Sequence, residues 1–403
     1  MNEGFARAET GAGIGNTVFV VFSDDWGRHP SSCQHLFRHI LPHARVIWVD
    51  TIGLRTPRLS LYDIRRALQV TLAWFRPAKK KAGPDPAGAA SRPAAQRPLV
   101  LKPAMWPSFR RNWCAALNQR LLSRAVHRAL KAAAPGRTAV LVSTLPIVPS
   151  LFRDPVFRKK IYYCVDDFTE WHGIDGEAMR RLENRTLQAC DLMIATSGPI
   201  LEARAPLTRS ASLLTHGVDV DHFSRALPDP SSPLAGASGP VIGMFGVFDR
   251  RIDGNALRAA ALLMPHATFA VVGPVVDRAP GEFKDVPNLR FLGSVPYAEL
   301  PGHVAHFDAC ILPYVVDRTT HNINPLKLKE YLATGKPVVA TPLPEAVRLG
   351  RFLTLADPEE FPRAVAACLE APRTDAAGLA DFLRGESWEA KSRIFLGEIL
   401  KGP

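Results

Sequence analysis

Residues 319–340, TTHNINPLKLKEYLATGKPVVA, predict a short helix that leads into a buried strand. Asn324 is a suitable N-cap for this helix, and Pro325 suits its first helical position. The apolar residues that follow recur at helical spacing. Gly335 is expected to end the helix, and residues 337–340, PVVA, have the composition of a strand in a parallel sheet. The stretch therefore predicts one strand–helix repeat of an α/β domain.

Two charged side chains of this helix indicate a ligand. Lys327 lies in the first turn, beside the free N–H groups and the positive end of the dipole, where a cation is unfavourable unless an anion lies nearby. Glu330 follows three residues later on roughly the same face. A cation for phosphate and a carboxylate for sugar hydroxyls suit a nucleotide sugar, with Thr319 and Thr320 as further contacts to phosphate or sugar. The alternative, a surface Lys and Glu, explains Glu330 more easily than Lys327.

Strand and helix patterns alternate along the rest of the chain, as a parallel sheet requires. With 403 residues, the chain is too long for one ordinary core and suits two domains. The predicted strands of the first half are 17–23, 44–50, 99–105, 138–144, 159–165, 191–197 and 211–215, and the main predicted helices are 111–134 and 175–190. The predicted organisation is a flexible tail 1–16, an N-terminal domain 17–225 with a mobile insertion 78–98, a linker 226–240, a C-terminal domain 241–385 and a final helix 386–403.

Several further segments carry a family resemblance. They are HGVD at 216–219, IGMFG at 242–246, FAVVGP at 269–274, NLRFLG at 288–293 and FDACILPY at 307–314. With the P-x-K-x-x-E-Y-x-A-x-G-x-P-V-V pattern of residues 325–339, the chain resembles GT-B glycosyltransferases, in particular bacterial polysaccharide-assembly enzymes of the teichuronic-acid and xanthan-glucuronosyltransferase type. The resemblance implies an α/β fold of two Rossmann-like, doubly wound domains that face a cleft, with a C-terminal helix that crosses back to the N-terminal domain.

The resemblance also assigns a donor side to the C-terminal domain. It implies that Lys327, the backbone near Gly246 and also Arg251 bind the diphosphate, that Glu330 binds the ribose hydroxyls, and that Asn324 lies at the same site. No metal ligand and no cofactor are expected, because no D-x-D motif lies in a suitable place and a helix dipole with Lys and Arg can neutralise a leaving diphosphate.

Two positions depart from the broader GT-B pattern. Many retaining members carry a second glutamate eight residues before the position of Glu330, where this chain has Asn322. Many also carry an arginine directly after the glycine that matches Gly246, where this chain has Val247. Both departures count against a retaining mechanism without establishing inversion.

A cluster of polar residues follows the predicted strand 159–165. Ligands of open parallel sheets bind beyond the carboxyl ends of the strands, so this strand exit is a candidate acceptor site. An inverting transferase needs a base for the attacking hydroxyl, and by the resemblance Asp167 is the first choice and Asp166 the second. Trp171 and His172 are further acceptor-side candidates. The alternatives are a capping role for one aspartate and a core position for the tryptophan.

The first predicted strand ends in a second polar loop, Ser23-Asp24-Asp25-Trp26. We expect Asp24, Asp25 and Trp26 to position the acceptor or the donor phosphates rather than to carry the chemistry. No G-x-G-x-x-G follows this strand and no P-loop motif is present, so a dinucleotide site and a P-loop kinase are not indicated.

The charge of the chain is concentrated in residues 53–135. This region holds seventeen Lys and Arg against two Asp, a net charge of +15, whereas the whole chain carries +12. Aromatic and aliphatic residues alternate with the basic ones, which suits an anionic membrane surface. A solvated basic loop beside an ordinary helix is the alternative. Nucleic acid is not expected, because no helix-turn-helix, RNA-binding aromatic motif or zinc spacing is present.

The segments that would indicate secretion or membrane insertion are missing from the sequence. The N-terminus contains acidic residues and no apolar core, and no window has the 18 or more apolar residues of a membrane span. The six cysteines are scattered, which is typical of buried thiols in a reducing compartment. The sequence therefore predicts a cytoplasmic protein that is peripheral to the inner face of the cell membrane.

The resemblance and these patterns together imply a glycosyltransferase, hexosyl- or glucuronosyl-transferring, that uses a nucleoside-diphosphate sugar, with UDP as the expected nucleotide. The expected acceptor is a glycan or a lipid-linked glycan in cell-surface polysaccharide synthesis. One alternative is a nucleotide-sugar epimerase on the same fold, which needs no acceptor and no membrane-facing basic surface. Another is a catalytically silent membrane- or glycan-binding scaffold, which would release no nucleotide in a donor-hydrolysis assay.

Overall fold

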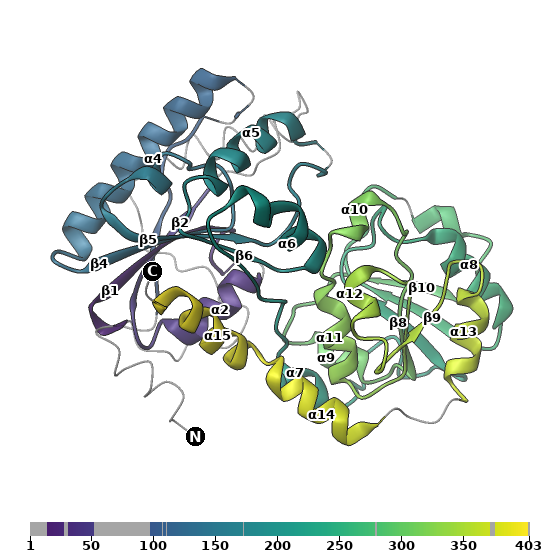
Figure 1. Cartoon of the computed structure of the whole chain (residues 1–403). Coiled ribbons are helices and arrows are strands. Elements are labelled where there is room, and N and C mark those ends of the chain that lie inside the picture. The colour runs from purple at the N-terminus through teal and green to yellow at the C-terminus, as the bar shows by residue number, and fades with distance from the viewer. Residues whose placement is uncertain are drawn as a thin grey trace. The chain divides into compact units, whose positions relative to one another are not determined.

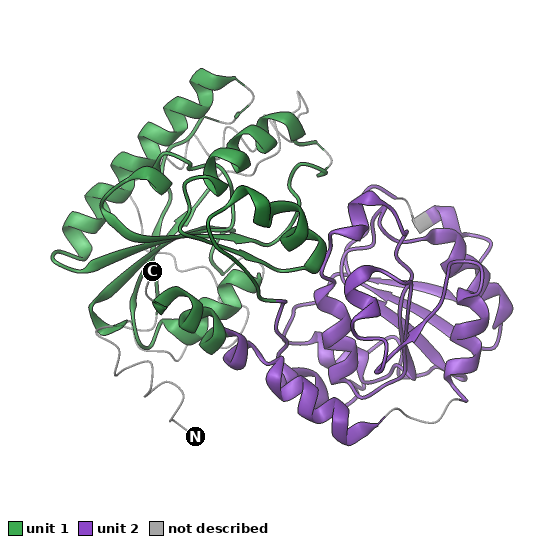
Figure 2. Ribbon diagram, in the orientation of Figure 1, with its two compact units in different colours: residues 1–214, 392–403 green, residues 215–391 purple. Residues whose placement is uncertain are grey.

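A computed structural model of the chain describes residues 14–27, 31–51, 97–106, 108–109, 111–171, 173–278, 280–370 and 375–401 (Figure 1). The chain divides into two compact units, Met1–Leu214 with Ser392–Pro403, and Thr215–Lys391 (Figure 2). Most of the predicted insertion 78–98 and residues 1–13 of the predicted tail lie outside the described residues. The tail prediction is wrong for the remaining three residues, because Ile14–Asn16 form a short 3₁₀ helix and Ile14 is buried.

Unit 1 is built on a seven-stranded parallel sheet with the strand order β3-β2-β1-β4-β5-β6-β7. The seven predicted strands are all present, although the third is shorter than expected. The bounds are β1 Thr17–Ser23, β2 Arg45–Asp50, β3 Leu99–Leu101, β4 Thr138–Ser143, β5 Phe157–Cys164, β6 Leu192–Ala195 and β7 Ala211–Leu213. The central strands are apolar on both faces because helices cover both faces of the sheet.

The helices α2, α5 and α6 of unit 1 begin where the sequence supplies a capping side chain, whereas α4 begins without one. The side chains of Ser31, Asp175 and Ser197 each accept a hydrogen bond from a backbone N–H of the first turn of the helix that follows. Figure 1 shows α4 and α5 on one face of the sheet and α2 on the other. The bounds are α2 Ser32–Ile40, α4 Asn112–Ala133, α5 Gly176–Leu187 and α6 Gly198–Arg204.

Unit 2 is built on a six-stranded parallel sheet with the order β10-β9-β8-β11-β12-β13. Its strands are β8 Val241–Phe245, β9 Thr268–Val272, β10 Leu289–Gly293, β11 Ala309–Leu312, β12 Val338–Ala340 and β13 Thr354–Leu355. Its helices are α7 Val220–Ser224, α8 Gly254–Leu263, α9 Leu300–Val304, α10 Arg318–His321, α11 Leu326–Ala333, α12 Pro344–Val347, α13 Phe361–Cys368 and α14 Ala376–Gly385. The order reverses between β8 and β11, which makes the carboxyl ends of these strands the expected ligand-binding edge.

The boundary between the units lies earlier than the sequence indicated. Unit 2 begins at Thr215, so the segment up to residue 225 does not belong to unit 1. The predicted linker 226–240 is part of unit 2 as well. Leu234 packs into its hydrophobic core, and the Ser232 hydroxyl lies 2.9 Å from the Nδ1 atom of His303. The linker prediction was wrong because Pro, Gly and Ser composition does not reveal the buried leucine and serine.

The last helix, α15 Trp388–Leu400, returns the chain to unit 1 from Ser392 onward, as predicted. The Ser392 hydroxyl donates a hydrogen bond of 2.8 Å to the carbonyl oxygen of Leu36 in α2. The ring of Phe395 is fully buried, with its centroid 6.0 Å from that of Phe37 and 5.5 Å from that of Tyr163. The C-terminus is therefore part of the core of unit 1.

We predict that Phe395→Ala lowers the free energy of unfolding by about 3–5 kcal/mol, because it leaves a cavity beside the packed rings of Phe37 and Tyr163. Ile394→Ala is the control, since Ile394 is 47% exposed on the same helix and its loss should cost about 0.5 kcal/mol or less. Urea unfolding of the full chain measures both values. Equal costs for the two variants would contradict the packing role of α15.

Candidate functional site

The donor-side helix predicted from residues 319–340 is α11, Leu326–Ala333, followed by β12. Its N-cap is Pro325, in an extended conformation, and no side chain caps the helix. The prediction of Asn324 as N-cap was therefore wrong by one residue, and Asn324 is buried beside the helix start. Gly335 follows the helix with φ +68°, a left-handed conformation that glycine adopts without strain, as expected for a helix end.

Lys327 reaches the carboxyl end of β8 because Gly246 leaves room for it, and Gly273 in turn leaves room for the Gly246 backbone. A Cβ atom on Gly246, whose φ is +110°, would lie 1.9 Å from Lys327 Cε and 2.8 Å from its Nζ. A Cβ atom on Gly273 would lie 2.0 Å from the carbonyl oxygen of Gly246. The ammonium group thus lies against the Gly246 backbone at the ligand-binding edge of the sheet, next to a helix N-terminus that no side chain caps. This is a suitable arrangement for a phosphate.

Glu330 lies buried one turn further along α11. Burial raises the pKa of its carboxyl group to about 7, although the Lys327 charge and a hydrogen bond from Tyr297 act in the opposite direction. That bond is long, 3.5 Å from the Tyr297 hydroxyl to Oε1, and the Tyr297 ring stacks on His222 at 4.4 Å. Hydroxyl groups of a ligand would stabilise the ionised form of this carboxyl group by donating the hydrogen bonds that it lacks in its buried position.

Arg251 is less suited to bind a diphosphate than the sequence indicated. Its guanidinium donates to both carboxylate oxygens of Asp249, at 2.9 Å and 2.7 Å, and lies 5.9 Å from the centroid of the Tyr314 ring. Burial opposes ionisation of Asp249, but Arg251 outweighs it and holds the pKa of this carboxyl group below its ordinary value. The Arg251 charge is therefore balanced within the protein.

Thr320 has a structural role in place of the predicted contact to phosphate or sugar. It is fully buried and forms a capping box with Asp317 at the start of α10. Its hydroxyl also donates to the carbonyl oxygen of Val315, 2.5 Å away. Thr319, the other threonine of the pair, is half-buried.

A buried group of charged side chains, absent from the sequence-based predictions, lies where the chain enters and leaves unit 2. We call Thr215, Lys329, Glu386 and Lys391 the junction cluster; all four belong to unit 2. Lys329 Nζ donates to Thr215 Oγ1 at 3.0 Å, to the carbonyl oxygen of His216 and to Glu386 Oε2. Lys391 Nζ donates to the same Thr215 oxygen at 2.9 Å and to Glu386 Oε1 at 2.7 Å.

The electrostatics of the junction cluster favour one arrangement of charges. Burial opposes ionisation of Glu386, yet the two lysines outweigh it and keep the pKa of this carboxyl group low. Burial lowers the pKa of Lys329 to about 8, against the attraction of Glu386. Burial and the two lysine charges together lower the pKa of His216 to about 3, so its ring is neutral at physiological pH. The cluster fixes α11 to both chain segments that lead out of the unit.

The strand exit of β5 holds the two candidate bases in different ways. Asp167 is held by an ion pair with Arg204 at 3.0 Å and by the hydroxyl of Thr169 at 2.6 Å. Arg204 in turn donates to Glu183 at 2.9 Å, and Glu183 accepts a bond of 2.8 Å from the Tyr162 hydroxyl. Burial opposes ionisation of Asp167, but Arg204 and Thr169 outweigh it and lower the pKa of this carboxyl group. Asp167 is thus part of a buried network that fixes the loop.

Asp166 is half-buried and accepts the backbone N–H of Asp167 at 2.8 Å through Oδ1. Trp171 is 40% exposed, with its ring 5.1 Å from that of Phe168. It is therefore not a core tryptophan and is open to a ligand. His172 lies outside the described residues.

The loop after β1 is held in place by its backbone. The carbonyl oxygen of Asp24 accepts from Trp48 Nε1 at 2.9 Å, and that of Asp25 accepts from Gln34 Nε2 at 3.1 Å. The backbone N–H of Trp26 donates to Asp50 at 3.0 Å. The exposed Asp24 and the half-buried Asp25 and Trp26 are thus presented at the carboxyl end of β1, on the same edge of the sheet as the β5 exit.

The described residues contain neither a candidate membrane span nor a candidate metal site. None of their helices combines the length and the apolar character that a bilayer crossing requires. Their His, Cys, Asp and Glu side chains form no group of three or more that could hold a metal ion.

Known proteins are similar to this chain in sequence and in structure. Residues 239–371 match the family model described as glycosyl transferases group 1. A curated protein of Bacillus subtilis (strain 168), whose provisional name is teichuronic acid biosynthesis glycosyltransferase TuaH, is 30% identical over 235 residues. That alignment covers 54% of this chain and 59% of the relative, so the chain spans little more than half of that protein's length.

Two solved structures show the same fold over nearly the whole chain. Sucrose-phosphate synthase from Thermosynechococcus elongatus has a TM-score of 0.60 and 15% identity, with 96% of this chain and 95% of that chain covered. HepE of Anabaena, in complex with UDP-glucose, has a TM-score of 0.55, 15% identity and the same coverage. The chain therefore has the GT-B fold of two parallel-sheet α/β domains, as predicted. The residues that match the model of glycosyl transferases group 1 lie within its second unit.

We predict that Glu386→Ala destabilises the chain by about 3–5 kcal/mol, because it leaves Lys329 and Lys391 buried without a carboxylate. Adding Lys329→Met to this variant should recover part of the loss, since it removes one of the two unpaired cations. Asp381→Asn is the matched control. Asp381 pairs with Arg384 at 2.9 Å with both side chains over 70% exposed, so its loss should cost less than about 1 kcal/mol. Urea unfolding that gives equal costs for Glu386→Ala and the control would contradict the role of the cluster.

Proposed function

We propose that the chain is a glycosyltransferase that moves a sugar from a nucleoside-diphosphate donor, with UDP as the nucleotide, to a glycan or lipid-linked acceptor in cell-surface polysaccharide synthesis. The observation that carries the proposal is the position of Lys327. Its ammonium group lies against the backbone of Gly246 at the carboxyl edge of the sheet, on the same helix as the buried Glu330. The family of residues 239–371 and the name of the Bacillus subtilis relative support it.

In the proposed donor site, Lys327 and the first turn of α11 bind the diphosphate, and Glu330 accepts hydrogen bonds from the ribose hydroxyls. The HepE structure with UDP-glucose supports UDP as the nucleotide. During transfer, the bond between the anomeric carbon and the diphosphate oxygen breaks, and negative charge develops on that oxygen. Lys327 and the helix N-terminus stabilise this charge as fixed groups that need no reorganisation. In this proposal Arg251 remains paired with Asp249 and does not bind the phosphate directly.

In the proposed acceptor site, a carboxylate at the β5 exit takes the proton of the acceptor hydroxyl as its oxygen attacks the anomeric carbon. The contacts favour Asp166 over Asp167 for this step, which reverses the order that the sequence indicated. Asp167 is committed to Arg204 and Thr169, and an aspartate stabilised in its ionised form is a weaker base. We assign to Asp167 the role of positioning the loop. Contact with the acceptor is assigned to Trp171, Asp24, Asp25 and Trp26.

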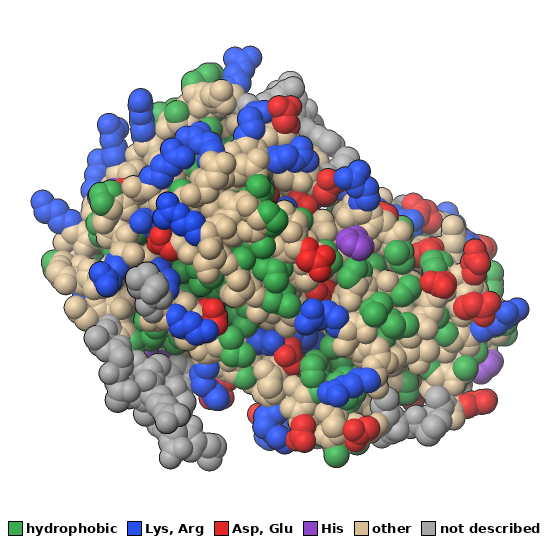
Figure 3. Space-filling view, in the orientation of Figure 1, with side chains coloured by type: hydrophobic (Ala, Val, Ile, Leu, Met, Phe, Trp, Pro, Cys, Tyr) green, Lys and Arg blue, Asp and Glu red, His purple; other side chains and the backbone are tan. Residues whose placement is uncertain are grey.

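The basic region supports an acceptor at an anionic membrane face, with the protein bound peripherally. Figure 3 shows Lys and Arg side chains gathered over the part of unit 1 that contains α4. Residues 52–96, which hold much of this charge, lie outside the described residues. An epimerase on the same fold would use the donor site alone, and it has no use for this surface.

We predict that the affinity for UDP rises with pH between about 5 and 7 and is level above that range. Without UDP, the Glu330 carboxyl group has a pKa of about 7, and ribose hydroxyls favour its ionised form. Binding of UDP below pH 7 therefore releases a proton. The rise should reach roughly 10- to 100-fold. Glu330→Gln should remove this part of the pH dependence, whereas the pH dependence that comes from the UDP phosphate itself should remain in both proteins.

Lys327→Met should weaken UDP binding roughly 10- to 100-fold at every pH. Calorimetry with UDP measures the affinity of the wild type and of both variants. Parallel pH profiles of the wild type and Glu330→Gln would refute the assignment of Glu330 to the ribose hydroxyls.

We predict that Asp166→Asn lowers turnover roughly 100- to 10,000-fold and leaves UDP affinity unchanged, because an amide cannot take the acceptor proton. The product should have the anomeric configuration opposite to that of the donor, which NMR of the product reports. Asp167→Asn is the paired variant, and it should destabilise unit 1 because Arg204 loses a charged partner. Near-normal turnover of Asp166→Asn, or a retained configuration, would remove the proposed base. Release of no nucleotide at all by the wild type would favour the scaffold alternative.

A further inference from the structure

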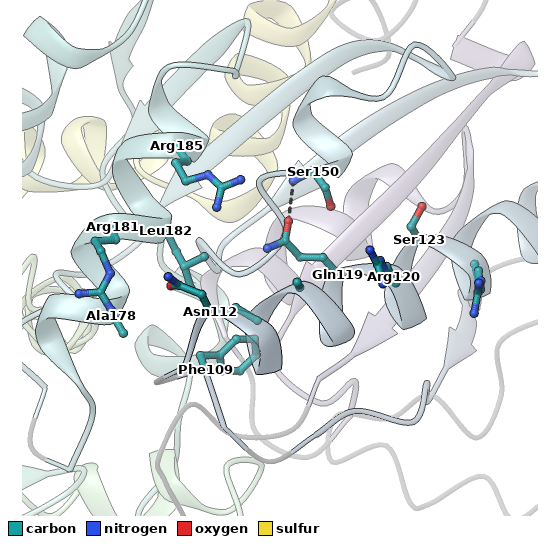
Figure 4. Close-up of a pocket in the computed structure, with 13 residues that line it drawn as sticks. Phe109, Asn112, Gln119, Arg120, Ser123, Ser150, Ala178, Arg181, Leu182 and Arg185 are labelled. Atoms are coloured by element: carbon teal, nitrogen blue, oxygen red, sulfur yellow. Dashed lines mark hydrogen bonds between the residues drawn. The ribbon is translucent and has the colours of Figure 1, made fainter.

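Unit 1 contains a cavity that belongs to neither the donor side nor the β5 exit. It has a volume of about 800 Å³ and lies between the first half of α4 and the helix α5. Its floor is apolar, with Phe109 and Leu182 among the side chains that form it. Figure 4 shows the hydrogen bond that the backbone N–H of Ser150 donates to the Gln119 side chain, and Arg185 extending from α5 toward these two residues. A cavity of this size accommodates a ligand of several hundred daltons.

Among the residues that the structure describes, four arginines line this cavity and no acidic residue does. Arg120 and Arg124 come from α4, and Arg181 and Arg185 come from α5, each pair four residues apart. Like charges at this spacing destabilise a helix, so the arrangement does not serve helix stability. Arg181 forms an exposed pair with Glu177 at 2.6 Å. Within the described ranges, no carboxylate pairs with the other three. All four arginines are exposed, so their fork-shaped donors are open to a phosphate oxygen that approaches from solvent.

Two exposed tryptophans lie close in the sequence to residues that line the cavity. Trp113 directly follows Asn112, which lines it, and Trp113 is 53% exposed. Trp106 is 47% exposed, and its ring centroid lies 5.7 Å from that of Trp113. Leu117, one turn after Trp113 on α4, is also exposed. Tryptophan with an exposed apolar neighbour beside basic residues is typical of a surface that lies at the boundary between lipid head groups and acyl chains.

We propose that this cavity is a binding site for the phosphate head group of an anionic membrane lipid, with Arg120, Arg124 and Arg185 as ligands of the phosphate. Trp106, Trp113 and Leu117 enter the head-group layer beside it. The inference rests on the membrane part of the proposed function and gives it a specific site in place of diffuse charge. It requires neither a donor nor a transfer step. The Trp side chains favour a lipid over a free phosphate, which would leave them in water.

The test uses the full chain and sedimentation with vesicles of equal parts phosphatidylglycerol and phosphatidylcholine. Arg120→Gln with Arg185→Gln removes one cavity arginine from each helix. Arg128→Gln with Arg180→Gln is the matched control, because both residues are exposed on the same two helices, as Arg120 and Arg185 are, and neither lines the cavity. Loss of two surface charges lowers vesicle binding by roughly 30-fold at most. We expect the cavity variant to lose at least tenfold more binding than the control, and Trp106→Ala with Trp113→Ala to weaken binding as well.

Three results would overturn the inference, each in a distinguishable way. If the two arginine variants lose equal amounts of vesicle binding, diffuse positive charge alone explains the binding. The membrane part of the proposed function would then be kept, and the cavity site would be rejected. Competition by glycerol phosphate at millimolar concentration, with no effect of the Trp variants, would make the ligand a soluble phosphate. No binding of the wild type to these vesicles would remove the membrane part of the proposed function together with this site. UDP calorimetry on every variant tests the donor site separately and should be unchanged.

Discussion

The structure of unit 2 depends on the carboxylate of Glu386, which is shared between two buried ammonium groups. Lys329 and Lys391 contact its two oxygens, and both also contact the hydroxyl of Thr215. Because buried charges are costly unless they are paired, this arrangement is favourable only when all the partners are in place. It therefore brings the segment that enters the unit, the segment that leaves it and the helix α11 to one point.

The same constraint orients the donor side of α11. Lys329 is held in the junction cluster, while its neighbours Lys327 and Glu330 lie at the proposed phosphate and ribose positions. A site whose groups must lie within a fraction of an ångström of a productive geometry gains from such support on the opposite side of its helix. The three charged residues of this short helix thus have different roles, which their environments decide.

Much of the fold could be predicted because it follows from local patterns. All seven predicted strands of unit 1 are present, and helices 111–134 and 175–190 agree with α4 and α5 within three residues at each end. Alternation of apolar strands and capped helices depends on near neighbours in the chain, so the sequence contains it directly. The errors fall where distant packing decides, as for the linker 226–240, where Leu234 is buried in the core of unit 2.

By itself, the sequence determined the parallel α/β architecture and the position of Lys327 and Glu330 on one helix, because both depend on residues close together in the chain. The return of the C-terminal helix was expected only from the family resemblance, since α15 packs on α2 more than 350 residues away. Only the tertiary structure decided the protonation and the partners of the charged side chains. Asp167 and Arg204, Lys329 and Glu386, and the arginines of α4 and α5 are each separated by tens of residues. Their roles depend on burial and on charges across the fold, which no spacing in the sequence encodes.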